Sequence, residues 1–287
     1  MIDETVEEIR ELQTHSSSAV AVKAARALGA LLNREYATVE EYERALKRNS
    51  DALRRASPSH ASLWTTQQTI IDAIDDEAIE TVAAAKERTQ AAIDRVIERV
   101  ETAKTEAAAT AATTITDGDT ILTHDYSTTV LAAIGRALDD GDVTGLSIHV
   151  TEARPRYLGR KMVRELAERS NVEATLLVDS AAGYQLENAD IDRVMVGMDC
   201  IVDDRLYNRI GTYPIAAAAA DIGVPMEVVG SSAKLVEGGF RFENEFRPIS
   251  EVMREPAEGF SITNPAYDAT PTDLLDHVYT DTGTIEY

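Results

Sequence analysis

The sequence predicts an α/β protein, with a helical amino-terminal domain over residues 1–115 and a parallel-sheet domain over residues 116–287. Three observations support this fold class. Apolar residues recur at helical spacing through about the first 110 residues, whereas short β-branched runs alternate with helical patterns after residue 116. The turn-forming sequence Thr116-Asp117-Gly118-Asp119 separates the two patterns.

The amino-terminal half is predicted to be helical almost throughout, because its apolar side chains share one face at helical spacing. The expected helices cover residues 6–12, residues 20–32, a segment after Thr38, a segment from about residue 60, and residues 77 to about 110. Thr38 and Glu41 form a capping box, in which the two side chains satisfy free backbone N–H groups at a helix start. Ser57-Pro58-Ser59 interrupts the helical pattern.

The carboxy-terminal half alternates between strands and helices. The expected strands are 120–123, 146–150, 174–178, 194–196 and 226–229, and the helical patterns are 127–138, 158–169, about 180–187 and 209–222, followed by a fixed turn at 264–271 and a short final helix. This alternation predicts a Rossmann-like parallel sheet with helices on both faces. The half contains neither Gly-x-Gly-x-x-Gly nor a Walker-type glycine loop, so dinucleotide and P-loop nucleotide sites have no support.

The charge balance describes the solvent around this protein more than its function. The formal net charge is −22, from 50 acidic and 28 basic residues, and six of the basic residues are lysine. This balance resembles that of proteins from extreme halophiles, whose carboxylate-rich surfaces stay soluble in molar salt. Nucleic acids and anionic membranes need a basic patch, so neither is an expected partner.

Cysteine and histidine give no indication of a disulfide framework or a metal site. Cys200 is the single cysteine and is expected to be a buried, unreactive thiol, and the five histidines lack metal-ligand spacing. Neither a metal nor a cofactor is therefore expected. No apolar run approaches the ~20 residues that span a membrane, and no signal-peptide pattern begins the chain. We expect a soluble, cytoplasmic protein.

Residues 194–213 carry the most informative pattern. The apolar run at 194–196 precedes Asp199, and Asn208 and Arg209 are expected to open the next helix. Ligands of open α/β sheets bind at the carboxyl ends of the strands. A helix amino terminus and Arg209 can hold an anion there, while Asp199 can hold hydroxyl groups or move a proton. The segment suits a small phosphorylated polyol.

Several motifs occur in a fixed order along the second half. They are residues 121–127, 151–155 with 159–161, 178–184, the segment that ends in 208–212, and 264–271. In order and spacing they resemble the translation initiation factor 2B α/β/δ family, which also contains the methylthioribose-1-phosphate and ribose-1,5-bisphosphate isomerases. The resemblance implies a ligand pocket between the two domains and a homodimer, or a larger homo-oligomer, formed through the carboxy-terminal half.

The chain departs from the isomerase branch at positions that matter for chemistry. In that branch a cysteine after the first strand is paired with a later aspartate to move protons. This chain keeps the aspartate as Asp199 but has Asp125 at the cysteine position, and a carboxylate is a far weaker nucleophile than a thiolate. The arginine-glycine phosphate loop of the branch corresponds here to residues 13–20, and its Arg-Pro-Thr corresponds to Ser57-Pro58-Ser59. Residues 18–20 and 126–127 instead resemble the α subunit of the initiation factor.

The resemblance favours a non-catalytic, α-subunit-like protein that binds a sugar phosphate or a nucleotide in a regulatory role, with initiation factor 2 as a candidate partner. The alternative is an isomerase that converts an aldose 1-phosphate to a ketose 1-phosphate, of the ribose-1,5-bisphosphate or methylthioribose-1-phosphate type. In that case Asp199 would be the proton donor and Asp125 the base. The identity of the ligand and the size of the oligomer stay open.

The expected site residues follow from this resemblance and from the strand ends. Asp199 and Asp125 are the catalytic candidates of the isomerase alternative, and the ligand-binding candidates are Asn208, Arg209, Lys234, His124 and Arg154. A packed, hydrogen-bonded position is the alternative for His124. A solvated surface pair is the alternative for Arg154 and Lys161.

Overall fold

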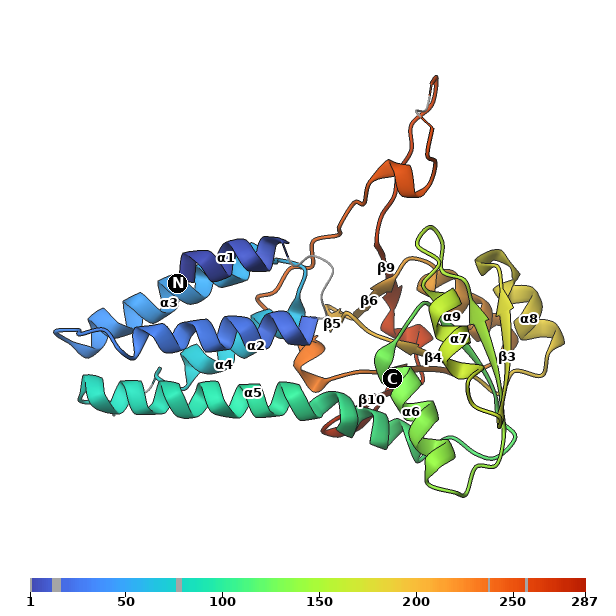
Figure 1. Ribbon diagram of the computed structural model, residues 1–287, viewed down its shortest axis with the longest axis horizontal. Coiled ribbons are helices and arrows are strands. Elements are labelled where there is room, and N and C mark those ends of the chain that lie inside the picture. The colour runs from blue at the N-terminus through green and yellow to red at the C-terminus, as the bar shows by residue number, and fades with distance from the viewer. Residues whose placement is uncertain (1, 12–16, 76–78, 237, 256–257) are drawn as a thin grey trace. The chain divides into compact units, whose positions relative to one another are not determined.

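The computed structural model describes residues 2–11, 17–75, 79–236, 238–255 and 258–287 (Figure 1). Contacts between residues divide the chain into two units. The first unit contains residues 1–102 and 233–243, and the second contains residues 103–232 and 244–287. The division falls inside one long helix, α5.

The first unit is helical over most of its described residues. Its helices are α1 (Ile2–Glu11), α2 (Ser17–Leu28), α3 (Val39–Ala56), α4 (Ala61–Asp72) and the first part of α5 (Val82–Ala112), with a short 3-10 turn at Gly29–Leu31 and the two-residue strand β8 (Leu235–Val236). Leu28, Leu46, Leu63 and Ile70 are fully buried in one shared core. The predicted amphipathic helices therefore pack their apolar faces together.

The predicted capping box begins α3. The Thr38 hydroxyl accepts a hydrogen bond from the Glu41 N–H at 3.2 Å, and the Glu41 carboxylate accepts one from the Ala37 N–H at 2.8 Å. The expected start of the long helix at residue 77 lies outside the described residues. In the structure α5 begins at Val82, where the Thr81 hydroxyl accepts a hydrogen bond from the Ala84 N–H at 3.2 Å.

The second unit is built on a sheet in which the strands follow the order β11-β10-β7-β4-β1-β2-β3. The strands are β1 (Thr120–His124), β2 (Leu146–Thr151), β3 (Val172–Leu177), β4 (Arg193–Gly197), β7 (Met226–Val229), β10 (His277–Thr280) and β11 (Gly283–Glu286). All neighbours pair in parallel except β10 and β11. The predicted α/β fold class is confirmed, and each of the expected strands is present.

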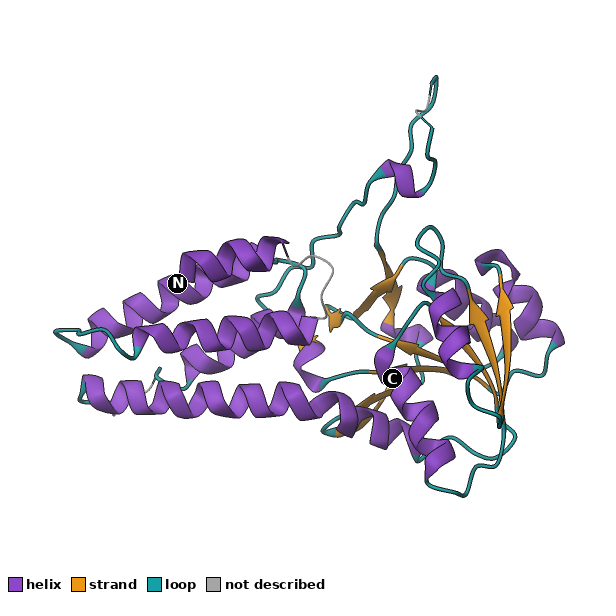
Figure 2. Ribbon diagram, in the orientation of Figure 1, coloured by secondary structure: helices purple, strands orange, loops and turns teal. Residues whose placement is uncertain are grey.

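Helices cover both faces of this sheet, as expected (Figure 2). They are α6 (Thr128–Asp139), α7 (Gly159–Leu166), α8 (Ala182–Asn188) and α9 (Thr212–Ile222), together with the end of α5. On β4, Met195 packs in a core with residues of α5, α6 and α7, while Val194 and Val196 point to the opposite face and are also fully buried. α9 contacts β4 and β7 and packs against α8. Burial of both faces is typical of a parallel sheet.

A small antiparallel sheet follows β4, and it corrects two predictions. Strands β5 (Cys200–Val202) and β6 (Arg205–Arg209) form a hairpin, and β6 also pairs with β9 (Tyr267–Pro271). Residues 208 and 209 therefore end a strand and do not open a helix, because they pair with Asp268 and Tyr267 of β9 before α9 begins at Thr212. The expected final helix is also wrong. A single 3-10 turn at Thr272–Leu274 leads into β10 and β11, which extend the main sheet.

The strand order places a switch point between β1 and β4. From β1 the chain continues outward through β2 and β3, whereas from β4 it continues in the opposite direction through β7 and β10. In open α/β sheets the crevice beyond the carboxyl ends of the strands at such a point is the usual ligand site. Asp125 directly follows β1, and Asp199 is the second residue after β4.

Candidate active site

Asp125 and Asp199 converge on one guanidinium group. The Arg209 Nε atom lies 3.4 Å from Asp125 Oδ2 and 3.8 Å from Asp199 Oδ2. The side chains of Asp125 and Asp199 are 9% and 24% exposed, so both carboxylates lie largely away from bulk water. The two aspartates come from adjacent strand ends of the main sheet, while Arg209 comes from the end of β6.

Burial and neighbouring opposite charges shift the pKa values of Asp125 and Arg209 in opposite directions. Burial raises the pKa of Asp125 and Asp199 raises it further, while Arg209 and His124 lower it, and the net pKa is higher than usual. Burial alone would lower the pKa of Arg209, but Asp199, Tyr267 and Asp125 raise it overall. Arg209 is therefore a permanent cation between two carboxylates. Such a pair, in which the environments of the two acids differ, is suited to proton transfer.

Tyr267 completes the surroundings of Arg209. The Arg209 Cζ atom lies 4.9 Å from the centroid of the Tyr267 ring, and the two residues are paired across β6 and β9. Burial, and next the charge of Asp199, raise the pKa of Tyr267 to about 12. Its phenol therefore stays neutral at ordinary pH. The ring holds the guanidinium in place through a cation–π contact.

The backbone around Asp125 is tightly constrained. Asp125 has a φ angle of 65°, in the left-handed region that few residues other than glycine adopt. The chain then turns at once into α6, where the Ser127 hydroxyl accepts a hydrogen bond from the Val130 N–H at 3.2 Å. A Cβ atom at Gly197 would lie 2.6 Å from Ser127 Oγ, so glycine at the end of β4 lets the two strand ends approach closely.

His124 lies beside the carboxylates but is held by the protein. Its Nδ1 atom is 2.6 Å from Thr151 Oγ1, and its Nε2 atom is 2.8 Å from the Ile210 carbonyl oxygen. Because a carbonyl oxygen only accepts, Nε2 is the donor. Gly211, with a φ of 110°, passes so close that a Cβ atom there would lie 2.8 Å from the imidazole. His124 therefore takes the packed, hydrogen-bonded alternative, and both of its nitrogens are engaged.

The start of α9 is also satisfied within the chain. The Asp268 carboxylate accepts hydrogen bonds from the N–H groups of Gly211 and Tyr213, at 2.7 and 3.1 Å. Asn208 is buried and donates to Thr212 Oγ1 at 3.0 Å. The expectation that this helix start holds an anion is therefore wrong, because a carboxylate of the chain already occupies it. Asn208 supports the turn in the structure, and its contact with a ligand stays a prediction.

A cavity connects Asp125 and Arg209 with basic residues on two loops. It is narrow, with a volume of about 20 Å³, and Asp125, Arg209, Arg154, Arg156, Arg247 and Asn264 supply its polar groups. Of these, Arg156, Arg247 and Asn264 were not among the expected site residues. Asn264 stands in the motif at 264–271, which could have indicated it. Arg247 lies in a stretch without a motif, and only the tertiary structure brings it here.

The remaining expected residues lie elsewhere. Lys234 ends the 3-10 turn at Ser232–Lys234, in the segment that groups with the first unit, so its role at Asp199 stays a prediction. Lys161 on α7 is paired with Glu165 at 3.6 Å and faces the Tyr126 ring. Of the segment expected to match a phosphate loop, residues 13–16 lie outside the described residues. Cys200 is fully buried, as expected.

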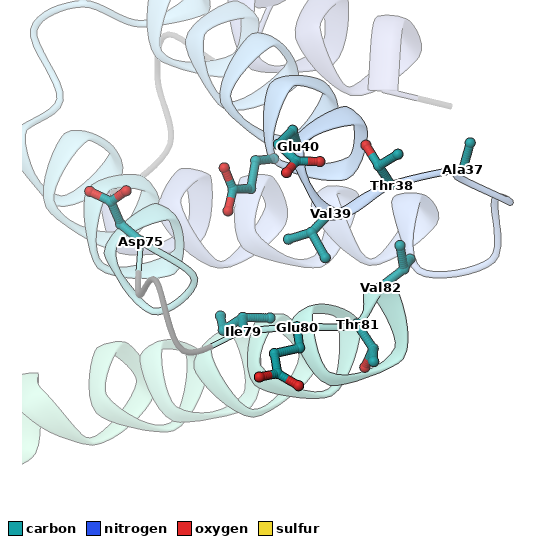
Figure 3. Close-up of a pocket in the computed structure, with 10 residues that line it drawn as sticks. Ala37, Thr38, Val39, Glu40, Asp75, Ile79, Glu80, Thr81 and Val82 are labelled. Carbon is teal, nitrogen blue, oxygen red and sulfur yellow. The ribbon is translucent and has the colours of Figure 1, made fainter.

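A larger cavity in the first unit has the wrong charge for a phosphorylated ligand. It has a volume of about 1110 Å³ and lies between residues 37–40 and residues 79–82 (Figure 3). Glu40, Glu43, Asp75 and Glu80 line it, without any lysine or arginine among the lining residues. A phosphate group there would be repelled. The arginine-lined cavity of the second unit is therefore the better candidate site.

The described residues carry neither a metal-ligand cluster nor a membrane-spanning helix. No group of three or more His, Cys, Asp or Glu side chains gathers in the way that metal ligands do, within the ranges that the structure covers. None of the described helices is both long and apolar enough to cross a membrane.

The parallel sheet and the paired carboxylates at its switch point define an α/β protein with a polar candidate site at the strand ends. Residues 13–287 match the model of the initiation factor 2 subunit family (IF-2B), and the chain belongs to this family. The resemblance inferred from the sequence motifs is thereby confirmed.

Curated relatives extend over nearly the whole chain. A ribose 1,5-bisphosphate isomerase of Haloterrigena turkmenica is 31% identical over 97% of this chain and 88% of its own length. A ribose 1,5-bisphosphate isomerase of Haloferax volcanii is 30% identical over 97% of this chain and 87% of its own. The crystal structure of a translation initiation factor eIF-2B of Pyrococcus horikoshii matches with a TM-score of 0.76 over 99% of this chain and 96% of its own, at 24% identity. This last match supports the fold alone.

These relatives overturn the expectation of a non-catalytic, regulatory binder. The full-length relatives that are about 30% identical are named as isomerases. The missing cysteine and the missing arginines had favoured a binder without catalytic activity. Proton movement needs only a paired acid and base, however, and the structure brings two carboxylates together at the strand ends.

Proposed function

We propose that this protein is an intramolecular isomerase that converts an aldose 1-phosphate to a ketose 1-phosphate, with ribose 1,5-bisphosphate as the first substrate to test. The observation that carries the proposal is the pair of carboxylates at the switch point, Asp125 and Asp199, joined by Arg209. The names of the relatives support the same reaction class.

The reaction needs one acid and one base. As the bond between carbon 1 and the ring oxygen breaks, the ring oxygen must gain a proton from an acid. The hydrogen on carbon 2 passes to carbon 1, and a base takes the proton of the hydroxyl group on carbon 2, which becomes the ketone. The acid loses one proton and the base gains one, while the phosphate stays on oxygen 1. A positioned acid and base typically contribute about 10²–10⁴-fold each to such a rate.

We assign the acid to Asp125 and the base to Asp199, the reverse of the roles expected from the sequence. Asp125 is the more buried carboxyl, and burial raises its pKa, so it is better able to hold a proton near neutral pH. Asp199 is the more exposed carboxyl, with its Oδ2 atom 3.8 Å from Arg209 Nε, and is left to accept the proton. Arg209 also supplies positive charge beside the phosphate on carbon 1.

The proposal is tested by assaying ketose formation from ribose 1,5-bisphosphate in molar potassium chloride. We expect turnover by the unmodified protein, and Asp199→Asn and Asp125→Asn each to lower kcat by about 10²–10⁴-fold, because each removes one proton-transfer group. The matched control is Asp203→Asn, an exposed carboxylate in the β5–β6 turn with a φ of 49°, which asparagine tolerates.

Two results would contradict the proposal. One is tight binding of ribose 1,5-bisphosphate and of methylthioribose 1-phosphate without turnover of either. The other is turnover that survives both aspartate substitutions at the rate of the Asp203→Asn control.

Assembly and partners follow from the family and not from this site. We propose a homodimer or larger homo-oligomer, as the motifs imply. Initiation factor 2 stays a candidate partner, but an isomerase does not require it.

A further inference from the structure

One carboxylate holds the turn that follows β6. This turn, residues 210–213, connects Arg209 at the end of β6 to the first residues of α9. Asp268 Oδ2 accepts hydrogen bonds from the Gly211 N–H at 2.7 Å and from the Tyr213 N–H at 3.1 Å. Two N–H groups of the turn are therefore bonded to a single oxygen atom of a residue on β9.

The same turn also lies against the His124 imidazole. The Ile210 carbonyl accepts a hydrogen bond from His124 Nε2 at 2.8 Å. Gly211 has a φ of 110°, and a Cβ atom there would lie 2.8 Å from His124 Cε1. Contact this close leaves no free space between the turn and the ring. A displacement of the turn would therefore move His124 or break its hydrogen bond.

The turn and the imidazole each adjoin one member of the proposed reaction site. Arg209 is the residue before Ile210, and Asp125 is the residue after His124. The hydrogen bond between Ile210 and His124 ties these two backbone segments together, and Arg209 Nε lies 3.4 Å from Asp125 Oδ2. Such separations matter, because a misplacement of about 1 Å can lower a rate by about 10²-fold.

The Asp268 carboxyl uses one of its two oxygens to hold the turn. Its Oδ1 atom is buried and has no hydrogen-bond partner among the residues that the structure describes. Burial raises the pKa of Asp268, and the N–H groups of Gly211 and Tyr213 and the charge of His124 oppose that rise. An asparagine with its amide oxygen in the place of Oδ2 would keep both hydrogen bonds without burying a charge. Asparagine is therefore the conservative substitution at this position.

We infer that Asp268 is a positioning residue for the proposed proton transfer. By holding the 210–213 turn against His124, it keeps the Arg209 guanidinium beside the Asp125 carboxyl group. The inference rests on the proposed function, and it adds a residue that acts through the backbone and not on the substrate.

The surroundings of Asp125 supply a readout of this role. Burial raises the pKa of Asp125 and Asp199 raises it further, while Arg209, His124 and the Tyr126 N–H lower it. If the turn moves away, Arg209 and His124 act less on the carboxyl group and its pKa rises. Because the protonated form of Asp125 is the donor, kcat then falls at a higher pH. A loss of global stability alone does not change this pKa.

The test measures kcat for ribose 1,5-bisphosphate as a function of pH in Asp268→Ala and Asp268→Asn. We expect alanine to lower kcat by about 10²-fold and to move its fall about one pH unit higher, because the pair is misplaced and Asp125 loses a neighbouring cation. Asparagine should restore most of both, since it keeps the acceptor.

The matched control is Asp276→Ala. The Asp276 carboxylate also accepts a hydrogen bond from a backbone N–H, that of Met226 at 2.7 Å, but at the amino end of β7 and so at the other end of the strands from the site. This variant should lower the free energy of unfolding without changing the pH at which kcat falls.

A second measurement does not depend on turnover. The pKa of Asp125 is followed by carbon-13 NMR of the aspartate carboxyl carbons, and its signal is the one that disappears in Asp125→Asn. A pKa that rises in Asp268→Ala, but not in Asp268→Asn or Asp276→Ala, supports the inference even if no aldose phosphate is converted. Absence of turnover by the unmodified protein contradicts only the proposed function.

The inference is overturned if the pKa of Asp125 is the same in Asp268→Ala as in Asp276→Ala. If alanine at position 268 prevents folding, Asp268→Ser is titrated in its place. Serine keeps an acceptor on a shorter side chain, so a smaller rise in the pKa of Asp125 is expected, and no rise overturns the inference.

Discussion

At the residue scale, the site depends on where a few side chains find their partners. Asp125 and Asp199 could be named from the sequence because each follows an apolar strand. Asn208 was expected to open a helix, yet it lies near the end of β6 and its amide is bonded to Thr212. Arg156 is exposed and precedes a helix, so nothing in its local sequence distinguishes it from a solvated arginine. Local sequence places a residue at a strand end but does not determine its hydrogen-bond partner.

Asp125→Cys tests the assignment of the proton donor. Burial raises the pKa of Asp125 and Arg209 lowers it, and the net pKa is higher than usual. The protonated acid therefore persists to a higher pH than in an ordinary aspartate. Because the protonated form donates, kcat should fall as pH rises through this pKa. A thiol has an ordinary pKa of about 8.5, so in Asp125→Cys the fall should move to higher pH. The measurement is kcat for ribose 1,5-bisphosphate as a function of pH. An unchanged falling limb would show that another group is the donor.

At the scale of elements, the central strands are held at their amino ends by a buried ionic group. Arg193 at the start of β4 lies 3.1 Å from Asp119, before β1, and 3.2 Å from Glu227 on β7. Tyr279 on β10 donates to Glu227 at 3.0 Å. These residues are far apart in sequence and none belongs to a recognised motif. The pairing of β4 with β1 and β7 brings them together.

Arg193→Met should lower the free energy of unfolding by about 3–5 kcal/mol, because it leaves buried carboxylates without their cation. Burial raises the pKa of Glu227, and Arg193 and Tyr279 oppose that rise. Without Arg193 the pKa rises further. A raised carboxyl pKa contributes stability that is present at acid pH and is lost as pH rises through it, so the defect should be smaller at low pH.

The measurement is urea unfolding of Arg193→Met at neutral and at mildly acidic pH. The double variant Arg193→Met, Glu227→Gln serves as the control, since it removes the stranded charge and should recover part of the stability. A double variant as unstable as the single one would show that the loss comes from packing and not from the unpaired carboxylate.

At the scale of the whole molecule, the net charge of −22 predicts a fold that is more stable in concentrated salt. Repulsion between surface carboxylates opposes the compact state, and salt screens it. The Debye length falls from about 10 Å at 0.1 M salt to about 3 Å at 1 M. The charge bears on stability and solubility, while the proposed proton transfer rests on Asp125 and Asp199 in the second unit.

The midpoint of thermal unfolding should therefore rise as potassium chloride increases from dilute to molar concentration. Each kcal/mol of relieved repulsion corresponds to about 2–4 °C in Tm for chains of this size class. The measurement is thermal unfolding followed by circular dichroism, with sucrose as a non-ionic comparison. A Tm that rises equally in sucrose, or that does not depend on salt, would contradict the role of charge.

The sequence by itself determined the fold class, the parallel strands and the two aspartates, because hydrophobic periodicity and turn residues are local signals. It failed for β6 and β10, whose extended form depends on pairing with β9 and β7, which are distant in the chain, and for β11, which pairs with β10. Only the tertiary structure decided that Arg209 joins Asp125 to Asp199 and that Asp268 occupies the start of α9. Hydrogen bonds and ion pairs between distant segments form after the strands are in register, so no local pattern encodes them.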